Sequence, residues 1–326
     1  MVTEVYPGIY LNEIPLPKNP LRAINSYILV SDSGNLIIDT GFNTLECQAA
    51  LMEGLKELEI DLKKTDLLIT HMHTDHSGLA PVLKEHGVKT IYFSQTDGEL
   101  FNQTSQKRKS ERDTFFATLN RIFGFDNDSA SRFGKEFGSR LDEPLEFTPL
   151  SEGDKLVVGD YCMEVVDVPG HTPGHIGLYE PSHKLFFCGD HILDGITPNI
   201  TFWGFDQDIL ATYLRSLNKV REYDINYLFT AHRKIIRDHQ TRITELITHH
   251  DERLQEILDI LRGGRKTIAE MAASMHWDLS YKKWEDFPHP QKWFASGEAL
   301  SHLEHLVHTG RVERIENDGA YYYGLV

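Results

Sequence analysis

The chain has 326 residues, 40% of them hydrophobic and 25% charged, a composition typical of folded globular proteins rather than disordered or fibrous ones. Its formal charge of −16 repels polyanions at long range, which disfavours nucleic acid as a partner unless a local basic patch exists. No run approaches the roughly 18 apolar residues that cross a bilayer, and three cysteines make no disulfide framework. We therefore expect a cytoplasmic protein without membrane contact, in which the cysteines are small buried residues.

The first third of the chain predicts strands that alternate with helices. Residues 25–39 predict a hairpin, residues 45–58 a helix and residues 66–70 a short apolar strand. A histidine-rich segment follows this strand directly, and we expect a helix over 77–86 and a strand over 90–94 after it. Strand, polar loop, helix and strand in this order are typical of an α/β protein.

Residues 97–143 interrupt this order and predict an inserted helical cap. Its phenylalanines, among them Phe115, Phe116, Phe123 and Phe125, either pack the cap helices together or wall a substrate site. A basic run over 107–112 is either a solvated helix face or a contact for an anionic group of the substrate.

The second half of the chain predicts a return to strands and then a helical end. Strands are expected between about 145 and 188, a helix over 207–221 and a last strand over 227–230. A long amphipathic helix follows, and after Gly263 and Gly264 the order is helix, loop, helix and hairpin, which is typical of a winged helix. The expected parts are a main domain over 1–240 with the 97–143 insert, a connecting helix over 241–262 and a winged-helix-like domain over 263–326.

Residues that can bind metal ions or support such ligands stand just after five of the apolar strands. Strand ends gather at one rim of a sheet-based sandwich, so residues far apart in sequence can meet there. A metal ion needs several imidazoles or carboxylates within about 2 Å. The candidates, in chain order, are Asp39, His71-Met72-His73-Thr74-Asp75-His76, His171, Asp190 and His232.

These candidates divide into two sets of ligands. In a His-x-His loop, alternate side chains can point to one ion, so His71, His73 and His171 form the first set. Asp75 and His76 can then hold a second ion together with His232. Asp190 can bridge the sets because a carboxylate has two oxygens, and two ions about 3.5–4 Å apart can share a hydroxide.

At these residues the sequence resembles the metallo-β-lactamase superfamily, over roughly residues 1–240. His-x-His-x-Asp-His followed by His, Asp and His in order is a specific pattern. The resemblance implies a four-layer αββα sandwich with these seven ligands, and it implies that Asp39 orients the ligand loop instead of binding metal. His175 is expected to be a structural or supporting residue. Ala231 departs from the pattern, since many relatives have glycine before the last histidine.

The resemblance also separates the branches of the superfamily. Asp190 stands where most true β-lactamases have cysteine, and His73 stands where flavodiiron proteins have glutamate. Glyoxalase II-like thioesterases, lactonases and the β-lactamase-like-2 group remain, and the last group pairs the catalytic domain with a C-terminal winged helix. Residues 196–200 and 296–303 resemble that group, some of whose members are ribonucleases.

The C-terminal part lacks the charge expected of a nucleic-acid reader. Residues 241–326 hold 10 basic and 14 acidic residues, a net charge of −4. We therefore expect this domain to pack on the catalytic domain or on a second subunit in a homodimer. Arg311, Arg314 and the tyrosines 321–323 either form a small single-strand platform or pack the aromatic face of a hairpin.

These residues together predict a metal-dependent hydrolase of a small-molecule substrate with an ester-like bond, a thioester or a lactone. Two divalent ions, zinc by preference but also manganese or iron, suit mixed imidazole and carboxylate ligands. A bridging hydroxide would attack the carbonyl carbon, and Asp75 would hold the second ion and orient the hydroxide. The alternatives are an endoribonuclease acting on single-stranded RNA and a mononuclear iron persulfide dioxygenase that uses His71, His171 and Asp190.

Overall fold

The computed structural model describes residues 2–17, 19–103, 117–125, 143–278, 281, 283–317 and 320–326. These residues divide into two compact units. The first unit comprises the described parts of Met1–Lys109, Ser139–Pro198 and Ser216–Arg242. The second comprises the described parts of Ser110–Gly138, Asn199–Arg215 and Ile243–Val326. The domain boundaries expected from the sequence stay a prediction.

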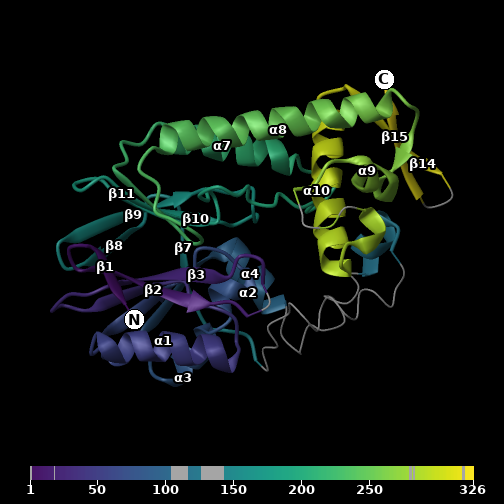
Figure 1. The fold of residues 1–326 in the computed structure, drawn as a ribbon. Coiled ribbons are helices and arrows are strands. Elements are labelled where there is room, and N and C mark those ends of the chain that lie inside the picture. The colour runs from purple at the N-terminus through teal and green to yellow at the C-terminus, as the bar shows by residue number, and fades with distance from the viewer. Residues whose placement is uncertain are drawn as a thin grey trace. The chain divides into compact units, whose positions relative to one another are not determined.

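The first unit contains a seven-stranded mixed sheet (Figure 1). Its first four strands pair antiparallel, and from β4 to β7 the pairing is parallel. Parallel neighbours end at the same rim, so β4, β5 and β6 deliver the residues that follow them to one place. In sheet order the strands are β1 (Thr3–Tyr6), β2 (Ile9–Pro15), β3 (Ala23–Leu29), β4 (Asn35–Ile38), β5 (Thr65–Leu68), β6 (Thr90–Ser94) and β7 (Thr148–Leu150).

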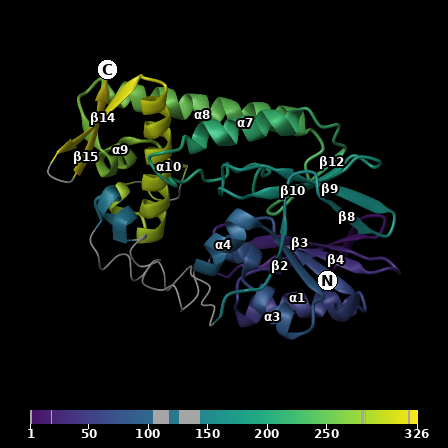
Figure 2. The same ribbon diagram turned by 180° about the vertical axis from the view of Figure 1, so that it is seen from behind.

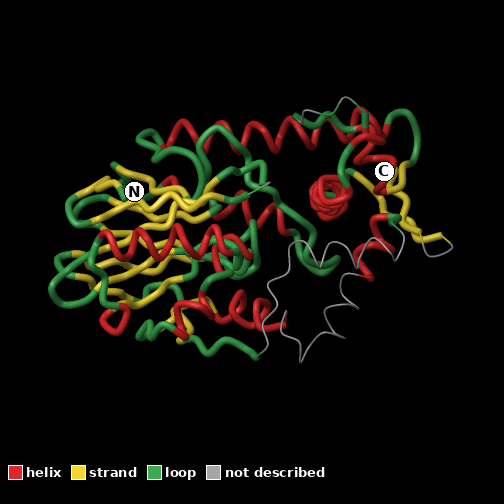
Figure 3. The backbone as a smooth tube through the Cα atoms, turned by 60° about the horizontal axis from the view of Figure 1, so that its bottom comes forward, coloured by secondary structure: helices red, strands yellow, loops and turns green. Residues whose placement is uncertain are grey.

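A second, five-stranded sheet completes the strand layers of this unit; Figure 3 shows the strands in yellow as two bands. Its β11 and β12 are parallel neighbours, and its other pairs are antiparallel. In sheet order the strands are β12 (Tyr227–Thr230), β11 (Leu185–Gly189), β10 (Ile176–Glu180), β9 (Tyr161–Asp167) and β8 (Lys155–Val158).

The two sheets enclose one apolar core and are covered by helices on their outer faces. Residues such as Tyr27 and Leu68 of the first sheet and Phe187 of the second form the core between them. Helices α1 (Leu45–Glu57) and α3 (Ala80–Glu85) cover the outer face of the first sheet (Figure 2). The C-terminal half of α7 (Ile209–Arg221) covers the second sheet, with Tyr223 beyond it packing on Tyr179 and Phe186; the expected four-layer αββα sandwich is thus confirmed.

Local chemistry explains where α1 begins and which face it buries. The Thr44 side chain accepts a hydrogen bond from the backbone N–H of Cys47, which caps the helix. Cys47, Leu51, Gly54 and Leu55 are spaced by three to four residues and are all buried. Gly54 is required because a Cβ there would lie 2.2 Å from the Asn12 amide of β2.

The helix expected over 77–86 is instead two short helices, α2 (Thr74–Ser77) and α3. They are separated at Gly78, where a Cβ would lie 2.4 Å from the Thr74 carbonyl and 2.6 Å from the Gly41 carbonyl. The close packing of this turn on the chain after β4 therefore requires glycine at this position. The remaining helices of the first unit are α4 (Gln95–Gln103), the 3₁₀ turn η1 (Leu62–Lys64) and the first residues of α8 (His239–Leu261).

The second unit consists of helices and a three-stranded antiparallel sheet in the order β13-β15-β14. Helix α9 begins with a capping box between Thr267 and Glu270. Helix α10 begins at residue 289, earlier than the start near residue 297 that its leucine spacing predicts, because a proline is tolerated in a first helical turn. The elements are helical residues 117–123, the first half of α7, the rest of α8, β13 (Lys266–Thr267), α9 (Ile268–Ser274), η3 (Trp284–Asp286), α10 (His289–His308), β14 (Val312–Asn317) and β15 (Ala320–Leu325). The winged-helix assignment of this order stays a prediction.

Most of the expected cap insert lies outside the described residues, including the basic run over 107–112 together with Phe115 and Phe116. Within the described part, residues 117–123 are helical. Phe123 is fully buried, and its ring packs on Trp293 in the core of the second unit. Phe123 therefore packs helices together and does not wall a substrate site.

Two whole-chain expectations can be compared with the structure. Cys47 and Cys188 are buried as expected, but Cys162 is exposed. It faces outward because β9 alternates its side chains and pairs Cys162 with Val157, which is 69% exposed. Across the described parts of the chain, no helix combines the length and the apolar character that crossing a membrane requires.

Candidate metal centre

The candidate ligands come from loops that leave the strands of both sheets of the first unit. Asp39 follows β4, and the loop from His71 to His73 follows β5. The single turn of α2 then redirects the chain, so Asp75 and His76 face differently from the extended histidines before them. Ser77 supports this turn through hydrogen bonds from its hydroxyl to the carbonyls of Met72 and His73. The other three candidates follow β9, β11 and β12 and are His171, Asp190 and His232.

The first expected set brings three ring nitrogens together. The Nδ1 of His73 lies 3.0 Å from Nε2 of His71 and 2.9 Å from Nε2 of His171. One ring nitrogen carries either a proton or a lone pair, so it cannot satisfy two such neighbours at once. The Thr70 hydroxyl donates to Asp39 (2.8 Å) and so accepts from Nδ1–H of His71 (3.2 Å). His71 therefore presents the lone pair of Nε2 to this cluster.

In the second expected set, as in His71, Nδ1 is hydrogen-bonded to the protein and Nε2 faces the cluster. Nδ1–H of His76 donates to Oδ2 of Asp39 (2.8 Å), and Nδ1–H of His232 donates to the carbonyl of Ala23 (2.7 Å). The Nε2 atoms of both histidines are buried and have no hydrogen-bond partner. Oδ2 of Asp75 lies 3.4 Å from Nε2 of His232 and 3.9 Å from Nε2 of His76. Two ring nitrogens that the protein leaves without a hydrogen bond thus converge with a carboxylate oxygen.

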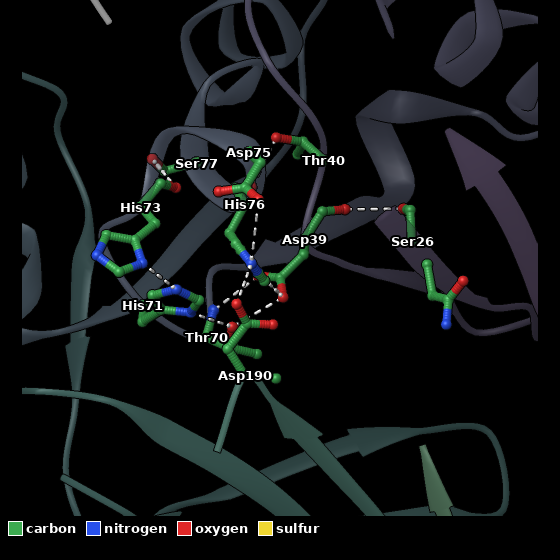
Figure 4. Close-up of polar contacts among 12 residues, drawn as sticks. Ser26, Asp39, Thr40, Thr70, His71, His73, Asp75, His76, Ser77 and Asp190 are labelled. Carbon is green, nitrogen blue, oxygen red and sulfur yellow. Dashed lines mark hydrogen bonds and ion pairs between the residues drawn. The ribbon is translucent and has the colours of Figure 1, made fainter. Parts of the chain in front are cut away.

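Asp190 faces both sets (Figure 4). Its Oδ2 lies 3.6 Å from Nε2 of His171 and 3.5 Å from Nε2 of His76, and its Oδ1 lies 3.5 Å from Nε2 of His232. Two atoms that each lie about 2.1 Å from one tetrahedral ion are about 3.4 Å apart. These separations therefore suit ligand atoms around a cation, and Oδ1 of Asp190 is buried without a hydrogen-bond partner.

Electrostatics differ between the two sets. Burial lowers the pKa of His73 to about 3 and that of His71 well below its ordinary value, so these two imidazoles are neutral. Burial acts the same way on His76, but Asp190, Asp39 and Asp75 outweigh it and raise the pKa of that histidine. Burial alone would raise the pKa of Asp75, yet His76 and His232 lower it to about 2. The second set is therefore a strongly negative place that attracts cations.

Asp39 makes the contacts that a residue orienting the ligand loop needs (Figure 4). Its carboxylate accepts hydrogen bonds from the backbone N–H of Thr70 (2.8 Å), the Thr70 hydroxyl and the His76 ring. Its backbone has a φ of 61°, a left-handed conformation that aspartate tolerates better than most residues. Ser26 on β3 supports this conformation by donating to the Asp39 carbonyl (2.7 Å).

His175 lies behind the cluster. Its Nε2 accepts a hydrogen bond from the backbone N–H of Asp190 (3.1 Å), and its ring stacks on that of His71 at 4.7 Å. Gly189 makes room for it, since a Cβ there would lie 2.7 Å from the imidazole carbon Cε1. These contacts are those of a supporting residue.

Asp97 is a residue of this region that the sequence did not predict as part of the site. It is fully buried in the first turn of α4 and accepts hydrogen bonds from Met72, Thr172 and Gly174. The sequence holds no signal for this role, because an acidic residue in a first helical turn is common for its favourable interaction with the helix dipole.

The side chains of the proposed single-strand platform are engaged within the second unit. Arg314 donates to Glu304 (2.5 Å) and stacks on Phe205 at 4.0 Å. Tyr323 is buried and donates to the same glutamate (2.6 Å). The packed-hairpin alternative therefore describes these two residues.

The fold and the converging ligand atoms define the class of a metal-binding hydrolase, and comparison with known proteins agrees. The family model of the metallo-beta-lactamase superfamily matches residues 19–232, and the model of the metallo-beta-lactamase-like C-terminal domain matches residues 281–326. The chain belongs to the metallo-β-lactamase superfamily and is a metallohydrolase.

Named relatives match more than half of the chain. It is 30% identical to the hydroxyacylglutathione hydrolase GloC of Haemophilus influenzae over 202 residues, which cover 62% of this chain and 81% of that protein. It is 25% identical to a beta-lactamase-like protein 2 homolog of Caenorhabditis elegans over 245 residues, 74% of this chain and 66% of that one. The chain thus spans about two thirds of that second relative, and the expected resemblance to its group is confirmed.

A solved structure covers nearly the whole chain. A metallo-beta-lactamase family protein of Thermus thermophilus matches with a TM-score of 0.84 and 26% identity, over 99% of this chain and 100% of that chain. The superfamily fold is therefore confirmed for this chain.

Proposed function

We propose that the protein holds two divalent metal ions and hydrolyses an ester-like bond, a thioester or a lactone, in a small-molecule substrate. The first ion would be held by His71, His73 and His171, and the second by Asp75, His76 and His232. The observation that carries the proposal is Asp190, whose two oxygens lie 3.5–3.6 Å from ligand nitrogens of both sets. Zinc is the favoured metal, with manganese or iron as alternatives.

Such ions, when bound, polarise a carbonyl oxygen and lower the pKa of water. The chain's own residues hold and orient the reactants. The Asp75 side chain is 12% exposed, more than that of Asp190 or Asp39, so it is the carboxylate best placed to orient a water molecule. Asp39 and the Ala23 carbonyl keep the Nδ1 protons of His76 and His232 away from the cluster.

The ester-like substrate is supported by one relative and by chemistry. A hydroxyacylglutathione hydrolase, by its name, releases an acyl group from glutathione, whose acyl derivatives are thioesters. The ribonuclease alternative has less support, because Glu304 already binds Arg314 and Tyr323. The dioxygenase alternative uses one metal ion and would leave Asp75 and His232 without a metal to bind, although their buried ligand atoms converge.

A hydrolysis panel tests the proposal. Zinc-loaded and manganese-loaded protein is offered thioesters, lactones, a phosphodiester reporter and single-stranded RNA, with His71→Ala as the control. We expect acyl cleavage that the variant lacks. Preferential cleavage of the phosphodiester or the RNA would overturn the substrate class, and full activity of His71→Ala would overturn the metal site.

Two finer expectations belong to the same proposal. An anionic substrate would be cleaved with a lower KM than its neutral analogue, so the panel includes both forms of one thioester. The homodimer is tested by the mass that light scattering gives for the purified protein, with a monomer mass as the contradicting result.

A further inference from the structure

Asp97 joins two loops that carry ligands of the first set. Its Oδ2 accepts hydrogen bonds from the backbone N–H of Met72 (2.9 Å) and from the Thr172 hydroxyl (2.5 Å). Its Oδ1 accepts from the backbone N–H of Gly174 (2.7 Å). Met72 lies between His71 and His73, and Thr172 follows His171 directly, so one carboxylate spans both ends of the three-histidine cluster.

The two loops also meet at their other ends, where the backbone N–H of Ile176 donates to the Thr70 carbonyl (3.0 Å) and the ring of His175 stacks on that of His71. They leave different sheets, since β5 belongs to the seven-stranded sheet and β9 to the five-stranded sheet. The His171 loop lies close to the start of α4 at Gly174, where a Cβ would lie 2.6 Å from the Ser94 hydroxyl and 2.7 Å from Oδ1 of Asp97. The loop thus seats directly on the start of α4.

Helix α4 is a rigid support for this carboxylate. A Cβ at Gly98 would lie 2.4 Å from the ring of Phe147, so helix and ring are in tight contact. The Asn102 side chain pairs with the backbone of Leu145 through two hydrogen bonds, of 2.9 and 2.7 Å. A side chain on a helix that is fixed by packing and hydrogen bonds holds its hydrogen-bond partners in a better defined position than a side chain on a free loop.

The second set is held by other groups. His76 is oriented by Asp39, and His232 by the Ala23 carbonyl of β3. Asn25 and Tyr27 of the same strand donate to the Thr230 carbonyl just before that histidine (2.9 and 2.8 Å). The three hydrogen bonds that Asp97 accepts from Met72, Thr172 and Gly174 reach none of these groups.

We infer that Asp97 is a positioning residue of the three-histidine set, whose carboxylate holds the His71–His73 loop and the His171 loop in register for a metal ion. The inference rests on the proposed ligand sets. Loss of the carboxylate would weaken the ion of the first set and leave the ion of the second set unchanged. Burial raises the pKa of Asp97 to about 6, and the three donors oppose this, so the group accepts as a carboxylate at neutral pH.

Zinc titration against a chromophoric chelator tests the inference set by set. His232→Ala leaves the first set complete, and His171→Ala leaves the second set complete, so each variant reports one ion. Asp97→Asn keeps the shape of the side chain but turns an N–H₂ toward at least one of the three donors. We expect it to weaken zinc about tenfold or more in the His232→Ala background, and less than about threefold in the His171→Ala background.

Thr172→Val is the gentler second variant, because it removes one donor to Asp97 and keeps the carboxylate. We expect a loss of zinc affinity of about fivefold in the His232→Ala background. Thr65→Val is the matched control: Thr65 is equally buried, and its hydroxyl donates to the Asp61 carbonyl (2.8 Å) far from both loops. The control should leave zinc affinity unchanged. Thr172→Val also keeps the test open if Asp97→Asn does not fold.

The outcomes distinguish a failure of the ligand sets from a failure of the role of Asp97. If His171→Ala and His232→Ala do not each remove one zinc ion from a wild-type total of two, the proposed ligand sets fail. If they do, but Asp97→Asn and Thr172→Val leave the first ion's affinity unchanged or weaken both ions equally, the role of Asp97 is overturned and the ligand sets stand.

Discussion

Buried histidines occur as clusters in both units of the molecule, and the two clusters differ in what their nitrogens face. In the first unit, each Nδ1–H of His76 and His232 is bonded to the protein, and the Nε2 atoms of both rings have no hydrogen-bond partner. In the second unit, His302 donates from Nδ1 to the Glu298 carbonyl (2.8 Å), and its Nε2 accepts from Nδ1–H of His250 (3.0 Å). The ring nitrogens of the first cluster converge on one point, whereas those of the second are hydrogen-bonded in series from His250 to His302 to the Glu298 carbonyl.

A lowered pKa alone would not distinguish a candidate ligand from a packed histidine. Burial lowers the pKa of His302 to about 3, the same direction and value as for His73. What separates them is direction: in the described ranges, the triads of converging ligand atoms include only residues of the first unit. In the pair of His250 and His302, Nε2 of His250 has no hydrogen-bond partner and lies near the cation of Arg253, which disfavours a metal ion. Burial and a low pKa therefore occur in both kinds of histidine, and the convergence of ligand atoms distinguishes the candidate metal ligands.

The largest difference between the clusters should appear in activity. We expect His71→Ala to lower kcat/KM for the best substrate of the panel by about a thousandfold or more, because a Lewis-acid contribution of several kcal/mol is lost. His302→Gln should leave kcat/KM within about threefold, because its ring only bonds inside the second unit. A comparable loss of activity in both variants, measured on folded protein, would abolish the distinction.

A smaller effect should follow from a substitution of Asp39, whose carboxylate orients the ring of His76. Asp39→Asn is expected to weaken zinc about 10- to 100-fold, because the amide N–H₂ must face either the Thr70 N–H or the His76 ring. Asparagine tolerates the φ of 61°, so the backbone is preserved. Chelator competition measures the affinity. An unchanged affinity would mean that Asp39 does not orient the loop.

The chain of histidines in the second unit should contribute to stability. We expect His302→Gln to lower the free energy of unfolding by about 1–3 kcal/mol, because the buried Nδ1–H of His250 loses its acceptor or keeps it in poorer geometry. Urea unfolding followed by circular dichroism measures the change. Equal stability of variant and wild type would show that this pair is dispensable.

The same pair predicts a dependence of stability on pH. The pKa of His302 is lowered to about 3 in the folded state from 6.5, so the unfolded state binds more protons between these values. The group's contribution is therefore fully present above pH 6.5 and is lost as pH falls toward 3, by about 1.4 kcal/mol per pH unit. The stability difference between wild type and His302→Gln should shrink when urea unfolding is repeated at pH 5. A difference that is constant from pH 8 to pH 5 would contradict this.

The sequence by itself determined the elements and the candidate ligands of the first unit. Apolar periodicity predicted the hairpin of β3 and β4, the helix α1 and the strand β6, because their burial patterns are local. The loop from His71 to His76, with His171, Asp190 and His232 after later strands, indicated the site because ligand types and their spacing are written in the chain.

Only the tertiary structure decided which of the 17 histidines share a cluster and which atoms they present. His250 and His302 meet across 52 residues, and Asp97 meets Thr172 across 75, contacts that no local pattern encodes. The need for glycine at position 78 and the exposure of Cys162 likewise depend on neighbours that arrive from elsewhere in the chain. The physical reason is the same in each case: a hydrogen bond needs its two atoms within about 3 Å, and packing sets that distance for residues remote in sequence.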